Sequence, residues 1–137
     1  MTTEALQTAL AAEHAAVFVY GALGGQTSRS SDPTLYAEVT AAYTTHRARR
    51  DEVRALVVEA GQDPVAAEPG YDLPADLTTP VAVADRALEL ERACAATYAY
   101  VVASTRGAQR AWAIDALLDA AVRTLAFGGR PEILPGL

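Results

Sequence analysis

The sequence predicts an all-α fold: a four-helix up-down bundle with one long crossover between the second and third helices. Of its 137 residues, 31 are alanine, the residue with the highest helix propensity. Apolar residues recur in steps of three and four along four segments, as they do on the buried face of a helix. The connections between these segments are short, long and short, which is typical of a bundle with one crossover. A chain of this length is expected to form a single domain over residues 1–137.

The first two helices are bounded by residues typical of helix ends. The first is expected over residues 3–23, with the Gly24-Gly25 pair as its stop. The second is expected over residues 33–60, with a proline at its first position and Gly61 after its last. Only a few polar residues connect them, so we expect two antiparallel neighbours.

Residues 62–79 are expected to be a long crossover rather than a domain linker, because neither half of the chain could bury its apolar face alone. The third helix is expected over residues 80–103, again with a proline at its first position. A cap at Ser104 or Thr105 would begin the fourth helix, which should end near Phe127.

Composition excludes several classes of protein. The net charge of −6 and pI of about 4.8 argue against a nucleic-acid-binding protein, which usually presents a basic face. No apolar run is long enough to span a membrane. A single cysteine, Cys94, excludes an internal disulfide and fits the reducing cytoplasm. We therefore expect a cytoplasmic protein that binds neither nucleic acid nor membrane.

Two distant stretches repeat one pattern, in which Leu-x-x-Glu is followed by a tyrosine seven residues after the glutamate. The pattern occurs at Glu13 and Tyr20 and again at Glu91 and Tyr98. At helical spacing, its leucine, glutamate and tyrosine share the stripe that should face the core. Because a buried carboxylate is costly unless it is paired or binds a metal, the repeat predicts an acidic site inside the bundle.

The pattern of acids can be compared with that of ferritin-like two-metal proteins. In those proteins two helices each supply one glutamate, and the other two helices each supply a Glu-x-x-His. Glu13 and Glu91 match the lone glutamates. On the second helix, His46 matches the histidine, but Tyr43 stands where its acid partner would be. On the fourth helix, the candidate acids are Asp115 and Asp119, and no histidine follows either one at the required spacing.

The whole chain resembles the small ferritin-like family of unknown function found in actinobacteria. The resemblance rests on residues 12–21, 43–50 and 131–137. It implies a ferritin-like four-helix bundle and no established reaction. The closing segment, residues 131–137, is partly apolar and is expected to dock on the bundle or on a partner.

Arginines of the second helix offer the acids another partner. Arg49 or Arg50 faces the site, and a buried guanidinium can satisfy carboxylates through hydrogen bonds. We therefore expect a network of acids, arginine, histidine and tyrosine without metal. The hydroxyls of Tyr20 and Tyr98 are expected to bond the glutamates or His46; beside a metal they could instead act as redox relays.

These features predict a non-enzymatic binding or interaction protein with a degenerate central site and no cofactor. The alternative is a two-metal carboxylate oxidase or metal-binding protein that holds iron or manganese. Its ligands would be Glu13, His46, Glu91 and Asp119. A third possibility is a small anionic ligand at the inward arginines. We also expect a homodimer, because the apolar residues Val19, Leu117 and Ile133 are expected to face outward.

Overall fold

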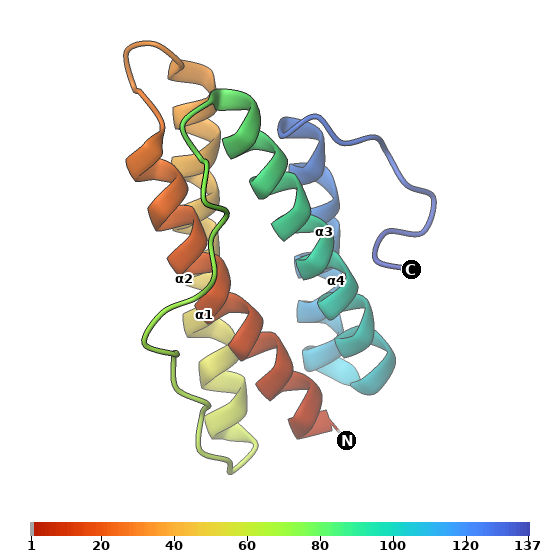
Figure 1. The fold of residues 1–137 in the computed structure, drawn as a ribbon. Coiled ribbons are helices and arrows are strands. Elements are labelled where there is room, and N and C mark those ends of the chain that lie inside the picture. Colours follow the sequence, from red (N-terminus) through yellow and green to blue (C-terminus); the bar gives the residue numbers. More distant parts are fainter. Residues whose placement is uncertain (1) are drawn as a thin grey trace.

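The computed structural model describes residues 2–137, which form four α-helices and no β-strand (Figure 1). The helices are α1 (Thr2–Gln26), α2 (Pro33–Glu59), α3 (Pro80–Ser104) and α4 (Gly107–Ala126). The all-α prediction and the number of helices are therefore confirmed. No helix within residues 2–137 has the length and apolarity that crossing a bilayer requires.

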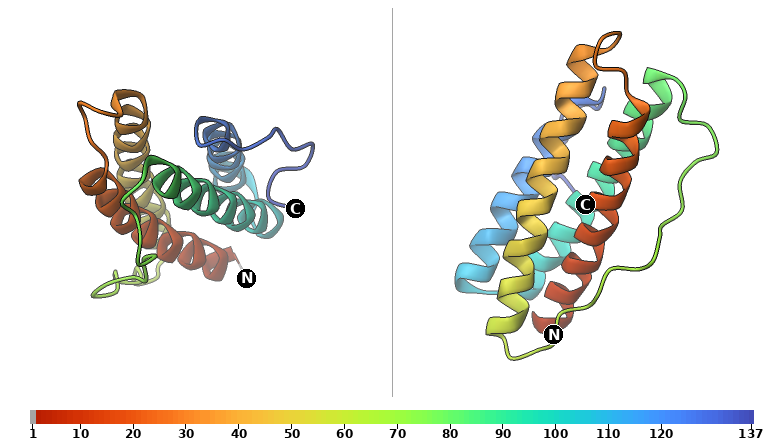
Figure 2. Two further views of the ribbon diagram at one scale, coloured as in Figure 1. Left: turned by 45° about the horizontal axis from the view of Figure 1, so that its top comes forward. Right: turned by 90° about the vertical axis from the view of Figure 1, so that its left-hand side faces the viewer.

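The long connection between α2 and α3 runs along the side of the molecule from one end to the other (Figures 1 and 2). Side chains of α1 hold it in place. The amide of Gln7 donates to the carbonyl of Asp63 at 2.7 Å and accepts from the N–H of Val65 at 2.9 Å. His14 contacts the Val65 carbonyl at 3.0 Å. As a result, α3 starts at the same end of the molecule as α2 (Figure 1).

Two helix ends differ from the prediction. Helix α1 continues through Gly24-Gly25 to Gln26, because packing against α2 outweighs the roughly 1 kcal/mol per residue by which glycine disfavours a helix. Helix α4 begins after Arg106, and neither Ser104 nor Thr105 caps it. Thr105 instead donates its hydroxyl to the carbonyl of Val101 at 2.7 Å, at the end of α3.

The core has two apolar parts, one toward each end of the bundle. One contains Tyr20, Val39 and Phe127, and the other contains Leu6 and Val57. Buried polar residues of α1, α2 and α3 lie between the two parts. These buried polar residues thus form a layer across an otherwise apolar bundle.

The outward placement of two apolar residues is wrong. Val19 is 1% exposed, and Leu117 packs against the core from a partly buried position. Both belong to faces that the neighbouring helices cover. Ile133, in the C-terminal segment, is 98% exposed.

Candidate functional site

Three fully buried side chains from three helices meet at the middle of the bundle. Glu13 belongs to α1, His46 to α2 and Glu91 to α3, and none of them is exposed to solvent. The distance from His46 Nδ1 to Glu13 Oε2 is 2.6 Å, and that from His46 Nε2 to Glu91 Oε1 is 2.8 Å. The imidazole therefore bridges the two glutamates of the repeated sequence pattern.

Tyr20 completes this arrangement, and we call Glu13, Tyr20, His46 and Glu91 the central cluster. The Tyr20 hydroxyl donates to Glu91 Oε1 at 2.6 Å. Its ring stacks on the imidazole, with centroids 5.3 Å apart and an interplanar angle of 21°. Because Tyr20 lies two helical turns after Glu13, one stripe of α1 supplies both residues.

The electrostatics of the cluster favour a protonated histidine. Burial alone would lower the pKa of His46, but hydrogen bonds and charges from Glu13 and Glu91 outweigh it and raise the pKa to about 9. A carboxylate only accepts hydrogen bonds, so a ring that contacts one through each nitrogen carries both protons. Burial raises the pKa of Glu13, against the opposing effects of His46 and Arg49. Burial and the charge of Glu91 raise the pKa of Tyr20, which therefore stays a hydrogen-bond donor.

A second group of charges lies between α2 and α4; we call Arg49, Asp119 and Arg123 the edge network. Arg49 Nη1 is 3.1 Å from Asp119 Oδ2, and Arg123 contacts the same oxygen from the next turn of α4. Although burial acts to raise the pKa of Asp119, its hydrogen bonds and charge interactions with Arg123 and Arg49 lower it overall. The Arg49 guanidinium also lies 5.6 Å from the centroid of the Tyr98 ring.

The edge network and the central cluster influence each other. The charge of Arg49 lowers the pKa of Glu13, and the charge of Glu91 raises that of Arg123. The acidic and basic side chains of the two groups also balance in number. Three acids face three bases: Glu13, Glu91 and Asp119 against His46, Arg49 and Arg123.

Four of the residues singled out in the sequence lie outside both the central cluster and the edge network. Arg50 turns away to pair with its neighbour Asp51 at 2.9 Å, and Asp115 is exposed. Tyr43 packs beside Gly21 and under the guanidinium of Arg47. Tyr98 is buried edge-on against Trp112, and its hydroxyl has no hydrogen-bond partner among residues 2–137.

Two residues near the site are not among the candidates predicted from the sequence. Arg123 is one of them, although an arginine four residues after Asp119 on a helix is a recognisable ion-pair spacing. Cys94 stands out in the sequence only as a lone cysteine that excludes an internal disulfide, yet its sulfur lies near the central cluster. The ligand atoms of His46, Glu91 and Cys94 are all within 4.8 Å of one another. Burial, followed by the charges of Glu13 and Glu91, raises the pKa of Cys94 well above its ordinary value, so the thiol stays neutral.

The donor set differs from that of a ferritin-like two-metal centre. His46 uses both nitrogens on carboxylates, and two arginines occupy Asp119. Where α4 would place a histidine, it has Leu118 or Val122, both exposed. Yet Glu13 Oε1 and Glu91 Oε2 are buried without a hydrogen-bond partner among the described residues. One imidazole and two glutamates thus match three of the six ligands of such a centre.

Comparisons with known proteins identify relatives without an assigned activity. A family model described as "Domain of unknown function (DUF4439)" matches residues 5–137. The crystal structure of a conserved hypothetical protein, rv2844, from Mycobacterium tuberculosis is similar in fold and sequence. The two chains are 30% identical, with a TM-score of 0.83, over 92% of this chain and 93% of the other. No curated protein matches the sequence.

Proposed function

Because the chain belongs to the DUF4439 family, whose description assigns no activity, we propose a function from the central cluster itself. We infer a ferritin-like protein whose central site is degenerate and holds no metal. In this proposal the protein acts in the cytoplasm by binding or interaction rather than by catalysis.

The bridge made by His46 carries this proposal. In a metal site, a histidine nitrogen with its lone pair points at the ion, and the other nitrogen is held by a hydrogen bond. Here each nitrogen lies 2.6 or 2.8 Å from a carboxylate oxygen, so the ring stands between Glu13 and Glu91. The protonated ring supplies a positive charge to both acids, which is a role that a metal ion would otherwise have.

The arginines of the edge network support the same proposal. Arg49 and Arg123 are both largely buried, and their charges act on the glutamates as well as on Asp119. A divalent ion beside them would meet two fixed positive charges, because arginine is not deprotonated in proteins. The charges of the residues present are already balanced without it.

Metal content tests the proposal directly. Protein purified from cultures supplemented with iron and manganese should contain well below one equivalent of either metal per chain by elemental analysis. The double variant Arg49→Gln/Arg123→Gln leaves three carboxylates facing one histidine and should bind Mn²⁺ more tightly than the wild type. Arg86→Gln on α3 is the matched control, because Arg86 lies outside both groups of charges. Two metals per wild-type chain would contradict the proposal, as would a folded double variant with no gain in affinity.

The alternative is a two-metal carboxylate oxidase or metal-binding protein that holds iron or manganese through Glu13, His46, Glu91 and Asp119. One observation favours it: Glu13 Oε1 and Glu91 Oε2 are buried oxygens without hydrogen-bond partners among the described residues. Hard oxygen atoms are suitable ligands for iron and manganese. For binding to occur, however, His46 would have to give up at least one of its two carboxylate contacts, and Asp119 would have to leave its arginines.

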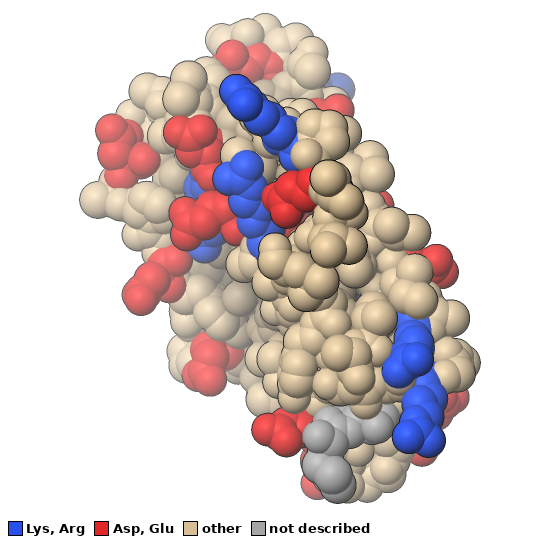
Figure 3. Space-filling model, turned by 90° about the vertical axis from the view of Figure 1, so that its right-hand side faces the viewer, with Lys and Arg blue, Asp and Glu red and all other residues tan. Residues whose placement is uncertain are grey.

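We also propose that the protein forms a homodimer through α4. Four aliphatic side chains on one stripe of this helix are 40–66% exposed: Ile114, Leu118, Val122 and Leu125. A two-fold dimer brings the same surface of each chain together, and an uncharged stripe is complementary to itself. Next to α4, the face that carries the C-terminal segment has an uncharged area below its centre, with charged side chains above this area and near the lower end (Figure 3).

A further inference from the structure

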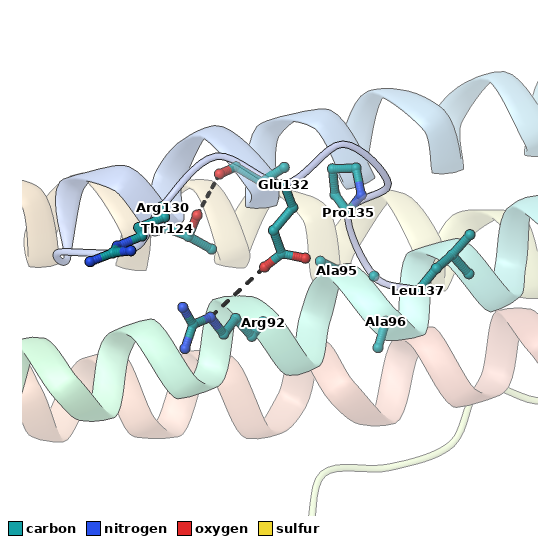
Figure 4. A pocket seen from close by; sticks show the side chains of 10 residues that line it. Arg92, Ala95, Ala96, Thr124, Arg130, Glu132, Pro135 and Leu137 are labelled. Carbon is teal, nitrogen blue, oxygen red and sulfur yellow. Dashed lines mark hydrogen bonds and ion pairs between the residues drawn. The ribbon is translucent and has the colours of Figure 1, made fainter.

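The C-terminal segment folds back over α3 and α4 and closes a pocket against them (Figure 4). The pocket has a volume of about 330 Å³ and lies outside the central cluster. A volume of this size is at the lower limit for small-molecule sites. The pocket therefore suits a short ligand.

A glycine near the end of the segment and another just before its start bring it close to the helices. Gly136 has a φ of +82°, and a Cβ there would lie 2.4 Å from the carbonyl oxygen of Ala95 on α3. At the other end, a Cβ on Gly129 would lie 2.8 Å from both Leu88 Cδ1 and the Thr124 carbonyl oxygen. The Gly129 N–H donates to that carbonyl at 2.9 Å. Any larger residue at either position would push the segment away, so the glycines set the wall of the pocket.

The lining combines an apolar floor with charge at one end. Ala95 and Ala96 of α3 and Ala121 of α4 form the floor. Arg92 and Arg130 lie toward one end of the pocket, and Pro135 lies toward the other (Figure 4).

The positive charge at this end is only weakly neutralised by the chain. Arg92 Nε is 4.0 Å from Glu132 Oε1, and both side chains are about half exposed. At that distance and exposure the ion pair contributes little. Arg130 pairs with none of the residues that the structure describes. A ligand carboxylate would therefore find two available guanidinium groups and displace only one weak contact.

We propose that this pocket binds a small monocarboxylic acid with a short apolar chain. The carboxylate lies against Arg92 and Arg130, and the chain lies over the alanine floor toward Pro135. Glu132 occupies the position of the carboxylate when no ligand is bound. The proposal is independent of whether the central cluster binds metal, since the two sites share no residue.

Titration with butyrate, hexanoate and octanoate, followed by amide NMR shifts of the whole chain, tests the proposal. We expect saturable shifts centred on residues 95–96, 121 and 136, and no such binding by hexanol, which lacks the charge. Arg92→Gln and Arg130→Gln should each weaken binding about fivefold, and Arg86→Gln should leave it unchanged. Glu132→Gln should strengthen binding, because it removes the competing carboxylate.

A further variant examines the wall of the pocket. Gly136→Ala should abolish binding while the circular dichroism of the four helices stays unchanged, because the contact it disrupts lies in the C-terminal segment. Three results would overturn the proposal: no saturable shift with any of the acids, equal binding of hexanol and hexanoate, or equal effects of Arg92→Gln and Arg86→Gln.

Discussion

The imidazole of His46 lies 2.6 Å from Glu13, a residue 33 positions earlier in the chain, and both side chains are fully buried. This contact joins α1 to α2, and its counterpart at 2.8 Å joins α2 to Glu91 on α3. A single side chain thus ties three helices together at the middle of the bundle. Removing it would leave two buried carboxylates without a cation between them.

Replacing His46 should therefore be costly. We expect His46→Ala to lower the free energy of unfolding by about 3–5 kcal/mol, the usual cost of leaving a buried charge unpaired. Urea denaturation followed by circular dichroism measures this change. His14→Ala is the matched control: its half-buried ring makes one contact, with the Val65 carbonyl, and its loss should cost about 1 kcal/mol. Equal losses in the two variants would show that the bridge is not important for stability.

The two buried tyrosines provide a second matched pair. Tyr20→Phe removes the hydroxyl that donates to Glu91 and should lower the free energy of unfolding by about 1–2 kcal/mol. Tyr98→Phe removes a hydroxyl that has no hydrogen-bond partner among residues 2–137, so its effect should be close to zero or slightly stabilising. If Tyr98→Phe is the more destabilising of the two, this assignment of their hydroxyls is wrong.

Stability should fall as the pH rises above neutrality. The pKa of His46 is about 9 in the folded protein, above the ordinary histidine value of 6.5, so folding favours the protonated ring. Its contribution is fully present below pH 6.5 and is lost as the pH rises through 9, by about 3 kcal/mol in total. The raised pKa of Glu13 acts in the same direction. Urea denaturation between pH 6.5 and 9.5 measures how the free energy of unfolding falls with pH. His46→Gln should remove this fall. If the free energy of unfolding falls equally in that variant, another group causes the effect.

The proposed dimer can be tested at the centre of the α4 stripe. Leu118 is 55% exposed and lies between Ile114 and Val122, so Leu118→Glu should place a charge in the middle of the interface. Analytical ultracentrifugation should show a dimer for the wild type and a monomer for this variant. Val58→Glu, on α2 and 54% exposed, is the control and should remain dimeric. A wild-type protein that is monomeric at all concentrations would contradict the dimer.

Much of the fold could be predicted from the sequence because helix periodicity and helix-end residues act locally. Pro33 and Pro80 each begin a helix, and Thr79 caps the second of these through the N–H of Ala82. The prediction that the first helix stops at Gly24-Gly25 was wrong, because packing on α2 decides whether α1 continues. Arg106 precedes α4 without a side-chain cap, so no residue marks that start in the sequence.

The site was harder to predict because it depends on how each helix is rotated. The three-and-four periodicity is enough to put Glu13 and Glu91 on buried stripes. It could not choose between neighbours such as Arg49 and Arg50, which point in different directions. The C-terminal pocket depends on the contact of Gly136 with α3, and no local sequence pattern predicts this contact.

We propose that His46 and the arginines, and not metal ions, neutralise the buried acids. Anomalous diffraction from crystals grown with iron and manganese, recorded at the absorption edges of both metals, tests it most directly. We predict no anomalous peak among Glu13, His46 and Glu91, and density for the imidazole within hydrogen-bond distance of both carboxylates. An anomalous peak between the glutamates, with His46 coordinated to it, would contradict the claim.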